Sequence, residues 1–299
     1  MSTPRFLTLP ASARALRVAT ARGEFAAHEA LPPDGVARGT ALLVPGFTGS
    51  KEDFIALLAP LADAGFRVVA VDQRGQNDTG GPDDESAYAR AELGRDVLAL
   101  TDAVREDPDE PVHLLGHSFG GFVVREAVLQ AAAARPGAPL PWASLTLMST
   151  GPGAIEPAEA AKTKLLLDAL PAMDLESIWQ VMKQMEAEDA GAGAPQLGAE
   201  VAEFIHRRWL ANIPAALTAM GRQLVDEPDR VAELAGACGA LPVLVLSGET
   251  DYVWPPDWQA EMARRLDADF VQVPGAGHSP NAERPEGTAA ALAAFWSRH

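Results

Sequence analysis

The chain has 299 residues, of which 47% are hydrophobic and 22% charged, and its 24 lysines and arginines against 41 aspartates and glutamates give a formal net charge of −17. This balance is typical of globular proteins and excludes disordered and fibrous classes. So negative a chain repels phosphate backbones and anionic lipid headgroups, and we therefore expect no nucleic-acid partner and no membrane insertion. Cys238 is the only cysteine, which excludes an internal disulfide and a zinc site built from several cysteines. We predict no metal and no cofactor. The first residues hold no apolar segment of the kind that a secretion signal needs, so we expect a cytoplasmic location.

Short apolar runs that end at turn-forming residues predict a series of strands. An antiparallel hairpin is expected from two alternating runs, residues 14–20 and 24–31, separated around Gly23. Six further runs are largely apolar, as strands buried on both faces of a parallel sheet must be. These runs are Thr40–Val44, Arg67–Val71, Val112–Leu115, Leu145–Met148, Val243–Leu246 and Phe270–Val273.

Segments of helical length follow most of these strands. They are Lys51–Ala64, Tyr88–Arg105, Phe119–Ala134, Pro256–Leu266 and Pro285–Trp296. Alternation of strands and helices produces βαβ units, in which parallel strands are joined through helices. We therefore predict an α/β protein with a doubly wound, mostly parallel sheet of eight strands.

The alternation breaks between about residues 153 and 239, where apolar side chains recur at helical spacing with no strand between them. They lie at Leu175, Ile178, Trp179 and Met182, and again at Val201, Phe204, Ile205 and Trp209. We predict a helical cap inserted after the sixth strand, over the carboxyl edge of the sheet; an ordinary helical layer is the alternative. The predicted domains are a core of residues 1–152 and 240–299 and a cap of residues 153–239.

A G-x-S-x-G pentapeptide, Gly116–Gly120, lies between a predicted strand and a predicted helix. In a strand–turn–helix elbow, glycines make room for a tight turn that exposes the serine hydroxyl above the sheet. The helix that begins beneath the serine favours a developing negative charge there. We predict Ser118 as a catalytic nucleophile; a serine that only caps a helix is the alternative.

A serine hydroxyl needs a base that takes its proton. His278 lies in the loop between the last predicted strand and the last predicted helix, at the edge of the sheet where the elbow is expected. The remaining histidines lie in the hairpin, within a strand, inside the elbow, in the cap and at position 299. We predict His278 as the base, with a structural loop histidine as the alternative.

The base in turn needs an acid that orients it and stabilises the imidazolium. Asp251 follows the penultimate predicted strand at the same edge, with Glu249 and Asp257 as nearby alternatives. The segment after the sixth strand, a second possible place for this acid, offers only Glu156. We predict Asp251 as the acid.

Acyl transfer also needs hydrogen-bond donors for the oxyanion. The backbone N–H of Phe119, directly after the nucleophile, is one predicted donor. The glycine-rich loop at residues 45–50 offers the backbone N–H of Phe47 as the second. Thr48 is the neighbouring alternative, and its hydroxyl is a further candidate.

Together these features resemble the α/β-hydrolase family with a helical cap, over nearly the whole chain. Besides the elbow, Asp72–Asn77 (D-Q-R-G-Q-N) is similar to the D-x-R-G-x-G segment of that family, and the loops that carry Asp251 and His278 resemble its acid and base loops. The resemblance implies Ser118 as nucleophile, Asp251 as acid and His278 as base.

Two positions depart from the family pattern. Pro45 stands where many members have the histidine of an H-G oxyanion motif, and Asn77 replaces a glycine. The predicted oxyanion donors are backbone amides, so the change at position 45 does not remove one. Members that open epoxides or displace halide carry aspartate at the centre of the elbow, so Ser118 argues for acyl chemistry.

Large apolar side chains within the predicted cap suggest an apolar acyl or alcohol group in the substrate. The predicted substrate contacts are Thr48, Trp179, Met182, Trp209 and Trp254. Packing within the protein is the alternative for each of the aromatic and methionine side chains.

We therefore predict a cofactor-free serine hydrolase that cleaves carboxylic esters of small to medium apolar substrates through an acyl-enzyme on Ser118. A thioesterase or acyl-transfer enzyme, a lactone hydrolase and a C–C bond hydrolase of secondary metabolism are alternatives on the same three residues. A ligand-binding receptor on a hydrolase scaffold is an alternative from a different class.

Overall fold

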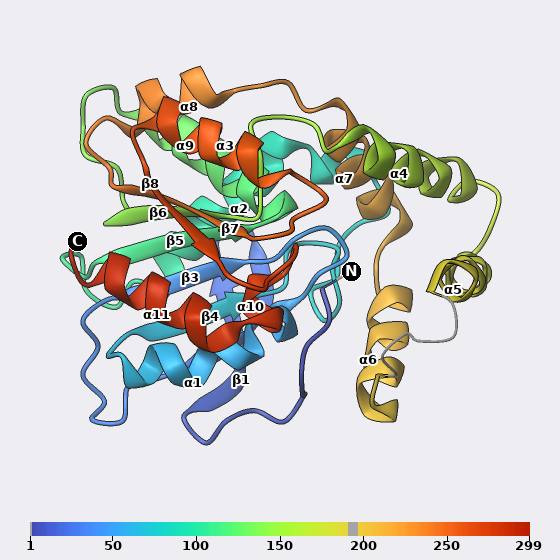
Figure 1. Cartoon of the computed structure of the whole chain (residues 1–299). Helices are drawn as coiled ribbons and strands as arrows, with labels where there is room; N and C mark the ends of the chain where they lie inside the picture. Colours follow the sequence, from blue (N-terminus) through green and yellow to red (C-terminus); the bar gives the residue numbers. More distant parts are fainter. Residues whose placement is uncertain (1, 191–196) are drawn as a thin grey trace.

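The computed structural model describes residues 2–190 and 197–299, which contain one eight-stranded sheet in the order β1-β2-β4-β3-β5-β6-β7-β8 (Figure 1). The strands are β1 (Ala13–Thr20), β2 (Gly23–Ala30), β3 (Thr40–Val44), β4 (Arg67–Val71), β5 (Val112–His117), β6 (Ser144–Met148), β7 (Val243–Gly248) and β8 (Asp269–Val273). β2 pairs antiparallel with β1 and β4, whereas all other neighbours are parallel. The predicted α/β fold with a mostly parallel sheet is confirmed.

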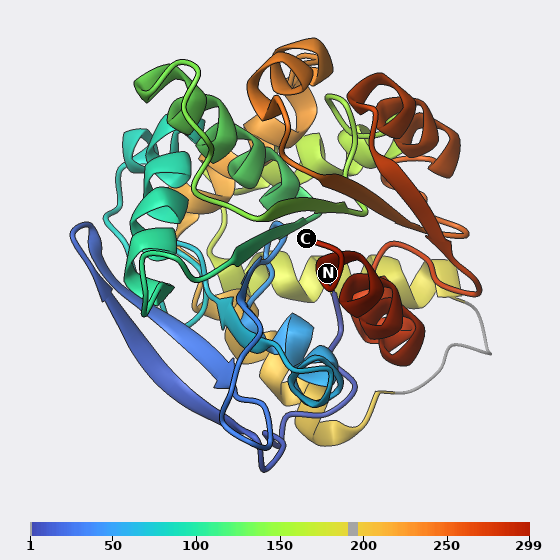
Figure 2. The ribbon, with the colours of Figure 1, turned by 90° about the vertical axis from the view of Figure 1, so that its left-hand side faces the viewer.

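Helices cover both faces of the sheet (Figure 2). Those outside the segment after β6 are α1 (Ile55–Asp63), α2 (Arg90–Val104), α3 (Phe119–Ala134), α9 (Pro256–Leu266), α10 (Pro280–Glu283) and α11 (Pro285–Trp296), with short 3-10 turns η1 (Lys51–Phe54) and η2 (Glu85–Tyr88). One apolar core lies between the sheet and α2, α3 and α9, and a second lies between the sheet and α1 and α11. Strands β3 to β7 are buried along their whole length, which explains their almost continuous apolar sequence.

The predicted helix Lys51–Ala64 is divided in the structure. Its first four residues form η1, and the α-helix begins at Ile55. The backbone N–H of Lys51 donates to the buried carboxylate of Asp72, 2.7 Å away, and the Lys51 side chain is buried as well. The start of this helix is therefore tied to the loop after β4, which periodicity along one segment could not indicate.

A helical insert follows β6, as predicted, and extends from one end of the sheet (Figure 1, right). Its helices are α4 (Pro157–Ala169), α5 (Leu175–Ala190), α6 (Ala199–Leu210), α7 (Pro214–Asp226) and α8 (Val231–Cys238). Helices α5 and α6 pack against each other around their own small apolar core, whereas α8 packs against α3 and α9 over the sheet. The division into a core and a cap at residues 153 and 239 stays a prediction.

A buried ion pair anchors α6 to the rest of the molecule. Arg208 donates from Nη1 to Oδ1 of Asp53 in η1 over 2.6 Å, and both side chains are at most 1% exposed. The same guanidinium donates to the backbone carbonyl of Ser2, 2.7 Å away. Removing one partner of such a pair typically costs roughly 3–5 kcal/mol, so the pair fixes α6 beside the loop that follows β3.

No helix within the described ranges is long and apolar enough to cross a membrane.

Candidate active site

The turn between β5 and α3 holds Ser118 in a strained conformation. Its φ of 56° and ψ of −123° lie where residues other than glycine are rarely found. A Cβ at Gly116 would lie 2.4 Å from the carbonyl oxygen of Gly120, and a Cβ at Gly120 would lie 2.4 Å from that of Val44. Only glycine fits these two positions, so the spacing of the pentapeptide follows from the tightness of the turn.

A chain of hydrogen bonds connects Ser118, His278 and Asp251. His278, in the loop between β8 and α10, has Nε2 at 3.0 Å from Oγ of Ser118 and Nδ1 at 3.0 Å from Oδ1 of Asp251. Facing a carboxylate, Nδ1 carries the proton and donates it, which leaves the Nε2 lone pair to accept from the serine hydroxyl. The three residues that the sequence singled out thus lie in contact, although 160 positions separate Ser118 from His278.

Asp251 is held firmly by groups other than His278. Its Oδ1 also accepts the backbone N–H of Val253 at 2.9 Å, and its Oδ2 accepts Nε2 of Gln259 at 3.0 Å. Burial acts to raise the pKa of Asp251, but the hydrogen bond and charge of His278, together with the backbone N–H groups of Val253 and Trp254, hold that pKa below its ordinary value. The carboxylate is therefore ionised across the neutral range.

The other acidic candidates lie elsewhere. Glu249 and Asp257 are exposed, and the Glu249 carboxylate accepts the backbone N–H of Gly275. Glu156 caps α4 by accepting the N–H of Ala158. Of these carboxylates, Asp251 is the one that contacts His278.

His117, next to the nucleophile, supports the position of His278. Its Nε2 lies 2.9 Å from the backbone carbonyl of His278, to which it donates, and the two rings are 5.3 Å apart. Burial, followed by the nearby charge of His278, lowers the pKa of His117 to about 3. His117 therefore stays neutral and fixes the loop that carries His278.

A second histidine–serine contact occurs on β5. His113 Nδ1 lies 2.9 Å from Oγ of Ser144, and the histidine ring stacks on Trp296. Both residues are at most 1% exposed, and burial lowers the pKa of His113 to about 4. This pair is packed inside the sheet layer, away from the cavity at Ser118, and we assign it a structural role.

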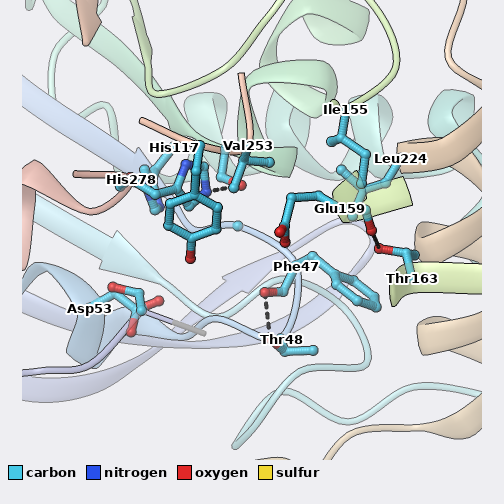
Figure 3. Close-up of a pocket in the computed structure, with 14 residues that line it drawn as sticks. Phe47, Thr48, Asp53, His117, Ile155, Glu159, Thr163, Leu224, Val253 and His278 are labelled. Carbon is cyan, nitrogen blue, oxygen red and sulfur yellow. Dashed lines mark hydrogen bonds between the residues drawn. The ribbon is translucent and has the colours of Figure 1, made fainter. Parts of the chain in front are cut away.

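A cavity of about 150 Å³, room for roughly five water molecules, opens beside Ser118 and His278 (Figure 3). Gly46, Phe47 and Thr48 of the loop after β3 form one side. The segment after β6 provides Ile155, Glu159, Thr163 and Leu224 on another side, and Tyr252 and Val253 follow the acid. Figure 3 shows the Glu159 side chain reaching into the space between Phe47 and His278.

Of the predicted substrate contacts, Thr48 lines the cavity, whereas the side chains from the helical insert do not. Trp179 and Trp209 belong to the core that α5 and α6 share, and Met182 packs against it. The indole Nε1–H of Trp209 donates to the backbone carbonyl of Leu175. These large side chains pack within an apolar core to which α4, α7 and Phe47 of the loop after β3 also contribute, because the apolar face of an amphipathic helix must be buried.

Trp254 is also behind the site and not in its wall. The side chain is fully buried, with its ring in an edge contact with Phe122 and its Nε1–H donating to the carbonyl of Gly153. Its ring centre lies 6.0 Å from that of His278. Trp254 therefore packs behind the loop that carries His278, on the side away from the cavity, while the smaller Val253 lines the cavity.

The predicted oxyanion donors border the nucleophile. Within the described residues, the backbone N–H groups of Phe47 and Phe119 have no acceptor, and that of Phe119 belongs to the first turn of the 16-residue helix α3, whose leading amides have no partner inside the helix. A Cβ on Gly46 would lie 3.2 Å from Oγ of Ser118, so the Gly46–Phe47 peptide directly adjoins the hydroxyl. The Thr48 hydroxyl donates to the carbonyl of Phe47 at 2.6 Å and is occupied within its own loop.

The D-Q-R-G-Q-N segment after β4 holds the loop after β3 in place. The ammonium of the buried Lys51 lies 3.0 Å from Oδ2 of Asp72 and 2.6 Å from Oδ2 of Asp78. Burial raises the pKa of Asp72 to about 7 against the opposing charge of Lys51. Arg74 pairs with Asp96, as a residue that pins its own loop should.

The asparagine that replaces a family glycine has a structural reason. Asn77 has a φ of 41°, in the left-handed region where asparagine is the best tolerated residue after glycine. Its side-chain amide contacts the carboxylates of Glu52 and Asp72 at 3.3 Å. Asparagine in place of glycine therefore preserves the turn and adds contacts to the buried carboxylates of Glu52 and Asp72.

Several residues at the site carried no signal in the sequence. Gln259 holds Asp251 from the first turns of α9, and Glu159 and Tyr252 line the cavity. The Tyr252 ring lies 5.9 Å from that of His278. None belongs to a motif, and their positions depend on how α4 and α9 pack, so only the folded chain reveals them.

Within the described part of the chain, no group of three or more His, Cys, Asp or Glu side chains is arranged to hold a metal ion.

The sheet order and the helical insert after β6 define the α/β-hydrolase fold. The chain belongs to the alpha/beta hydrolase family, whose model matches residues 41–291. It resembles the solved structure of a thermophilic esterase from Thermogutta terrifontis, with a TM-score of 0.70 and 23% identity over 95% of this chain and 98% of that one. That likeness shows the fold.

The matches among curated proteins include a long one and a short one. The chain is 25% identical to a monoacylglycerol lipase of Mycolicibacterium smegmatis over 265 residues, 84% of this chain and 85% of that protein. It is 39% identical, over 92 residues, to a protein of Variovorax paradoxus named as the carbamate hydrolase RutD. That second match spans 31% of this chain and 32% of the relative, about a third of each.

Proposed function

We propose that the protein is a serine hydrolase that cleaves small carboxylic esters through an acyl-enzyme on Ser118. The observation that carries this proposal is the pair of 3.0 Å contacts that join the Ser118 hydroxyl to His278 and His278 to the ionised Asp251, beside a cavity. A nucleophile, a base and an orienting acid in this order are what acyl transfer requires.

In the proposed reaction, the Ser118 oxygen attacks the ester carbonyl while Nε2 of His278 takes the hydroxyl proton. Asp251 stabilises the imidazolium that forms. The N–H groups of Phe47 and Phe119 bind the oxyanion of the tetrahedral intermediate, and removal of one such donor typically costs about 10²- to 10³-fold in kcat. His278 then protonates the departing alcohol, and a water molecule repeats the sequence on the acyl-enzyme. Each step uses groups of this chain and water.

The size of the cavity and the charge of its wall favour a small substrate that is neutral or positively charged. Its volume of about 150 Å³ is modest, and its wall includes the carboxylates of Asp53 and Glu159. Asp53 is neutralised by Arg208, whereas Glu159, 20% exposed, pairs with the exposed Lys162 at 2.7 Å. An exposed pair of this kind contributes about 1 kcal/mol or less, so the Glu159 carboxylate can still favour a cationic substrate over an anionic one.

The first test is covalent labelling. Wild type and Ser118→Ala are treated with a fluorophosphonate probe, and wild type is then assayed on p-nitrophenyl esters of increasing acyl length. We expect labelling of wild type alone and the highest kcat/KM on short acyl chains, because the cavity is small. Labelling without turnover would redirect the proposal to thioesters, lactones, C–C bonds or acyl acceptors. Absence of labelling would refute the hydrolase and favour a ligand-binding receptor.

A second test concerns substrate charge. Acetylthiocholine and its neutral isostere S-(3,3-dimethylbutyl) thioacetate differ only in charge, and release of the thiol is easily followed. Glu159→Gln should lower the ratio of kcat/KM for the cationic over the neutral ester by about fivefold, the equivalent of roughly 1 kcal/mol. Asp168→Asn, which makes the same charge change on an exposed part of α4, should leave the ratio unchanged. An equal effect of both substitutions would refute a specific role for Glu159.

A further inference from the structure

Two glutamines of the loop after β4 bind consecutive carbonyl groups of the loop after β3. Nε2 of Gln73 donates to the carbonyl of Pro45 at 2.8 Å, and Nε2 of Gln76 donates to the carbonyl of Gly46 at 2.8 Å. Both glutamine side chains are buried, Gln76 to within 1% of complete burial. The bond from Gln76 is made to the Gly46–Phe47 peptide, which adjoins Ser118.

The orientation of the Gln76 amide is fixed by its two partners. Its Oε1 accepts the backbone N–H of Gln73 at 3.3 Å, a group that can only donate. The Nε2 end must then face the carbonyl of Gly46, a group that can only accept. A reversed amide would place oxygen against oxygen and N–H against N–H, so this side chain has one satisfactory orientation.

The bond to Gly46 also determines where the next N–H points. The Gly46 carbonyl and the Phe47 N–H belong to one planar trans peptide, and in such a unit the two groups point in opposite directions. Gln76 holds the carbonyl toward the loop after β4. The Phe47 N–H is therefore directed to the opposite side of the peptide, where Gly46, Phe47 and Ser118 line the cavity.

This peptide needs such a restraint because of the glycine that precedes it. Gly46 is required for close approach, since a Cβ there would lie 2.9 Å from Cβ of Ser118. Glycine leaves the backbone free to rotate, so the peptide that follows has little intrinsic preference for one orientation. The turn that follows adds only one longer hydrogen bond, from the backbone N–H of Gly49 to the same Gly46 carbonyl at 3.1 Å. Thr48 within that turn is in the left-handed region with a φ of 56°.

We infer that Gln76 is a positioning residue that keeps the Phe47 N–H aimed at the oxyanion. The inference rests on the proposed function, because it assigns Gln76 to the same reaction. Gln76 acts through the Gly46–Phe47 peptide and does not itself touch the substrate. Its contribution should therefore appear in the transition state and not in substrate binding.

The test replaces Gln76 by methionine, which has a similar length and no donor. Because the oxyanion donor is displaced and not removed, we expect kcat to fall about tenfold to a hundredfold with KM changed less than about threefold. The inhibition constant of an alkyl trifluoromethyl ketone, which forms an oxyanion on the serine, should rise by the same factor as kcat falls. A purely structural role would leave that inhibition constant unchanged in the folded fraction, and such a result would overturn the inference.

Two further variants keep the test decisive if Gln76→Met folds poorly. Gln73→Met removes the matched bond to Pro45, one peptide further from the cavity, and should change kcat less than about threefold at a similar loss of thermal stability. Gln76→Glu restores a donor when its buried carboxyl is protonated, so its activity relative to wild type should recover as the pH is lowered. No recovery, or an equal loss of kcat in Gln73→Met, would contradict the inference. Absence of hydrolysis by wild type would instead refute the proposed function.

Discussion

Replacement of His278 by alanine is expected to lower kcat on a short p-nitrophenyl ester by about a million-fold. Among the described residues, no other base contacts Ser118, because the neighbouring His117 donates to the carbonyl of His278 and its pKa is lowered to about 3. Loss of the base in a comparable triad costs about 10⁶-fold in kcat, and the remaining acceleration comes from the oxyanion donors and from binding. The measurement is kcat under saturating substrate, with circular dichroism to verify the fold.

His206 provides the matched control. It is also partly exposed and also pairs with a carboxylate, Glu176, but it lies on α6 in the helical insert after β6. His206→Ala should retain wild-type kcat within about twofold. Added imidazole should restore part of the activity of His278→Ala and none to Ser118→Ala. Turnover by His278→Ala within tenfold of wild type would show that another group is the base.

The parts of the fold that the sequence predicts are those governed by neighbouring residues. The strands are short apolar runs because each is buried on two faces. The elbow is recognisable because glycine is the only residue type for which positions 116 and 120 have room. The acid and base follow from their place after β7 and β8 at one edge of the sheet. These features depend on local geometry and on strand order, both of which a single sequence carries.

The substrate pocket could not be predicted in the same way. An apolar residue on an amphipathic helix, such as Trp179 or Trp209, signals only that one face is buried, not what covers it. Here the partner helix covers it together with apolar residues of α4, α7 and the loop after β3, and the cavity is lined by Glu159 and Leu224, which no pattern marks. Whether such a residue packs inside the protein or lines the cavity depends on the tertiary packing of the helical insert.

Hydrogen-bond networks between distant loops are a second class of feature that the sequence does not reveal. Gln76 and Gly46 are 30 positions apart, and Gln259 binds Asp251 from a different element. A glutamine has no characteristic spacing relative to such partners. The D-x-R-G-x-G resemblance identified the segment, but not that its glutamines hold the carbonyls of the oxyanion loop.

Replacement of Asp251 by asparagine should lower kcat by about tenfold to a hundredfold, the equivalent of one charged hydrogen bond, through loss of charge and not through a changed tautomer. The N–H groups of Val253 and Trp254 both face Oδ1, so the asparagine must keep its oxygen there and still accept from Nδ1 of His278. Its new NH₂ then faces Nε2 of Gln259, and that amide cannot rotate without turning its Oε1 against the carbonyl of Trp254, to which Nε2 donates at 2.7 Å. The variant should therefore be less stable than wild type but keep His278 in place through the Oδ1 contacts.

Two pH measurements separate this interpretation from a loss of structure. A neutral amide stabilises the imidazolium less, so the acidic limb of the kcat/KM profile of Asp251→Asn should move to lower pH. In wild type the pKa of Asp251 is lowered in the folded state, so its carboxylate adds stability above the unfolded pKa of about 3.9 and loses that contribution as the pH falls through the folded pKa. The variant should lack this part of the acid dependence in thermal unfolding. Asp257→Asn, at the exposed start of α9, should change neither profile, and an activity loss there equal to that of Asp251→Asn would refute Asp251 as the acid.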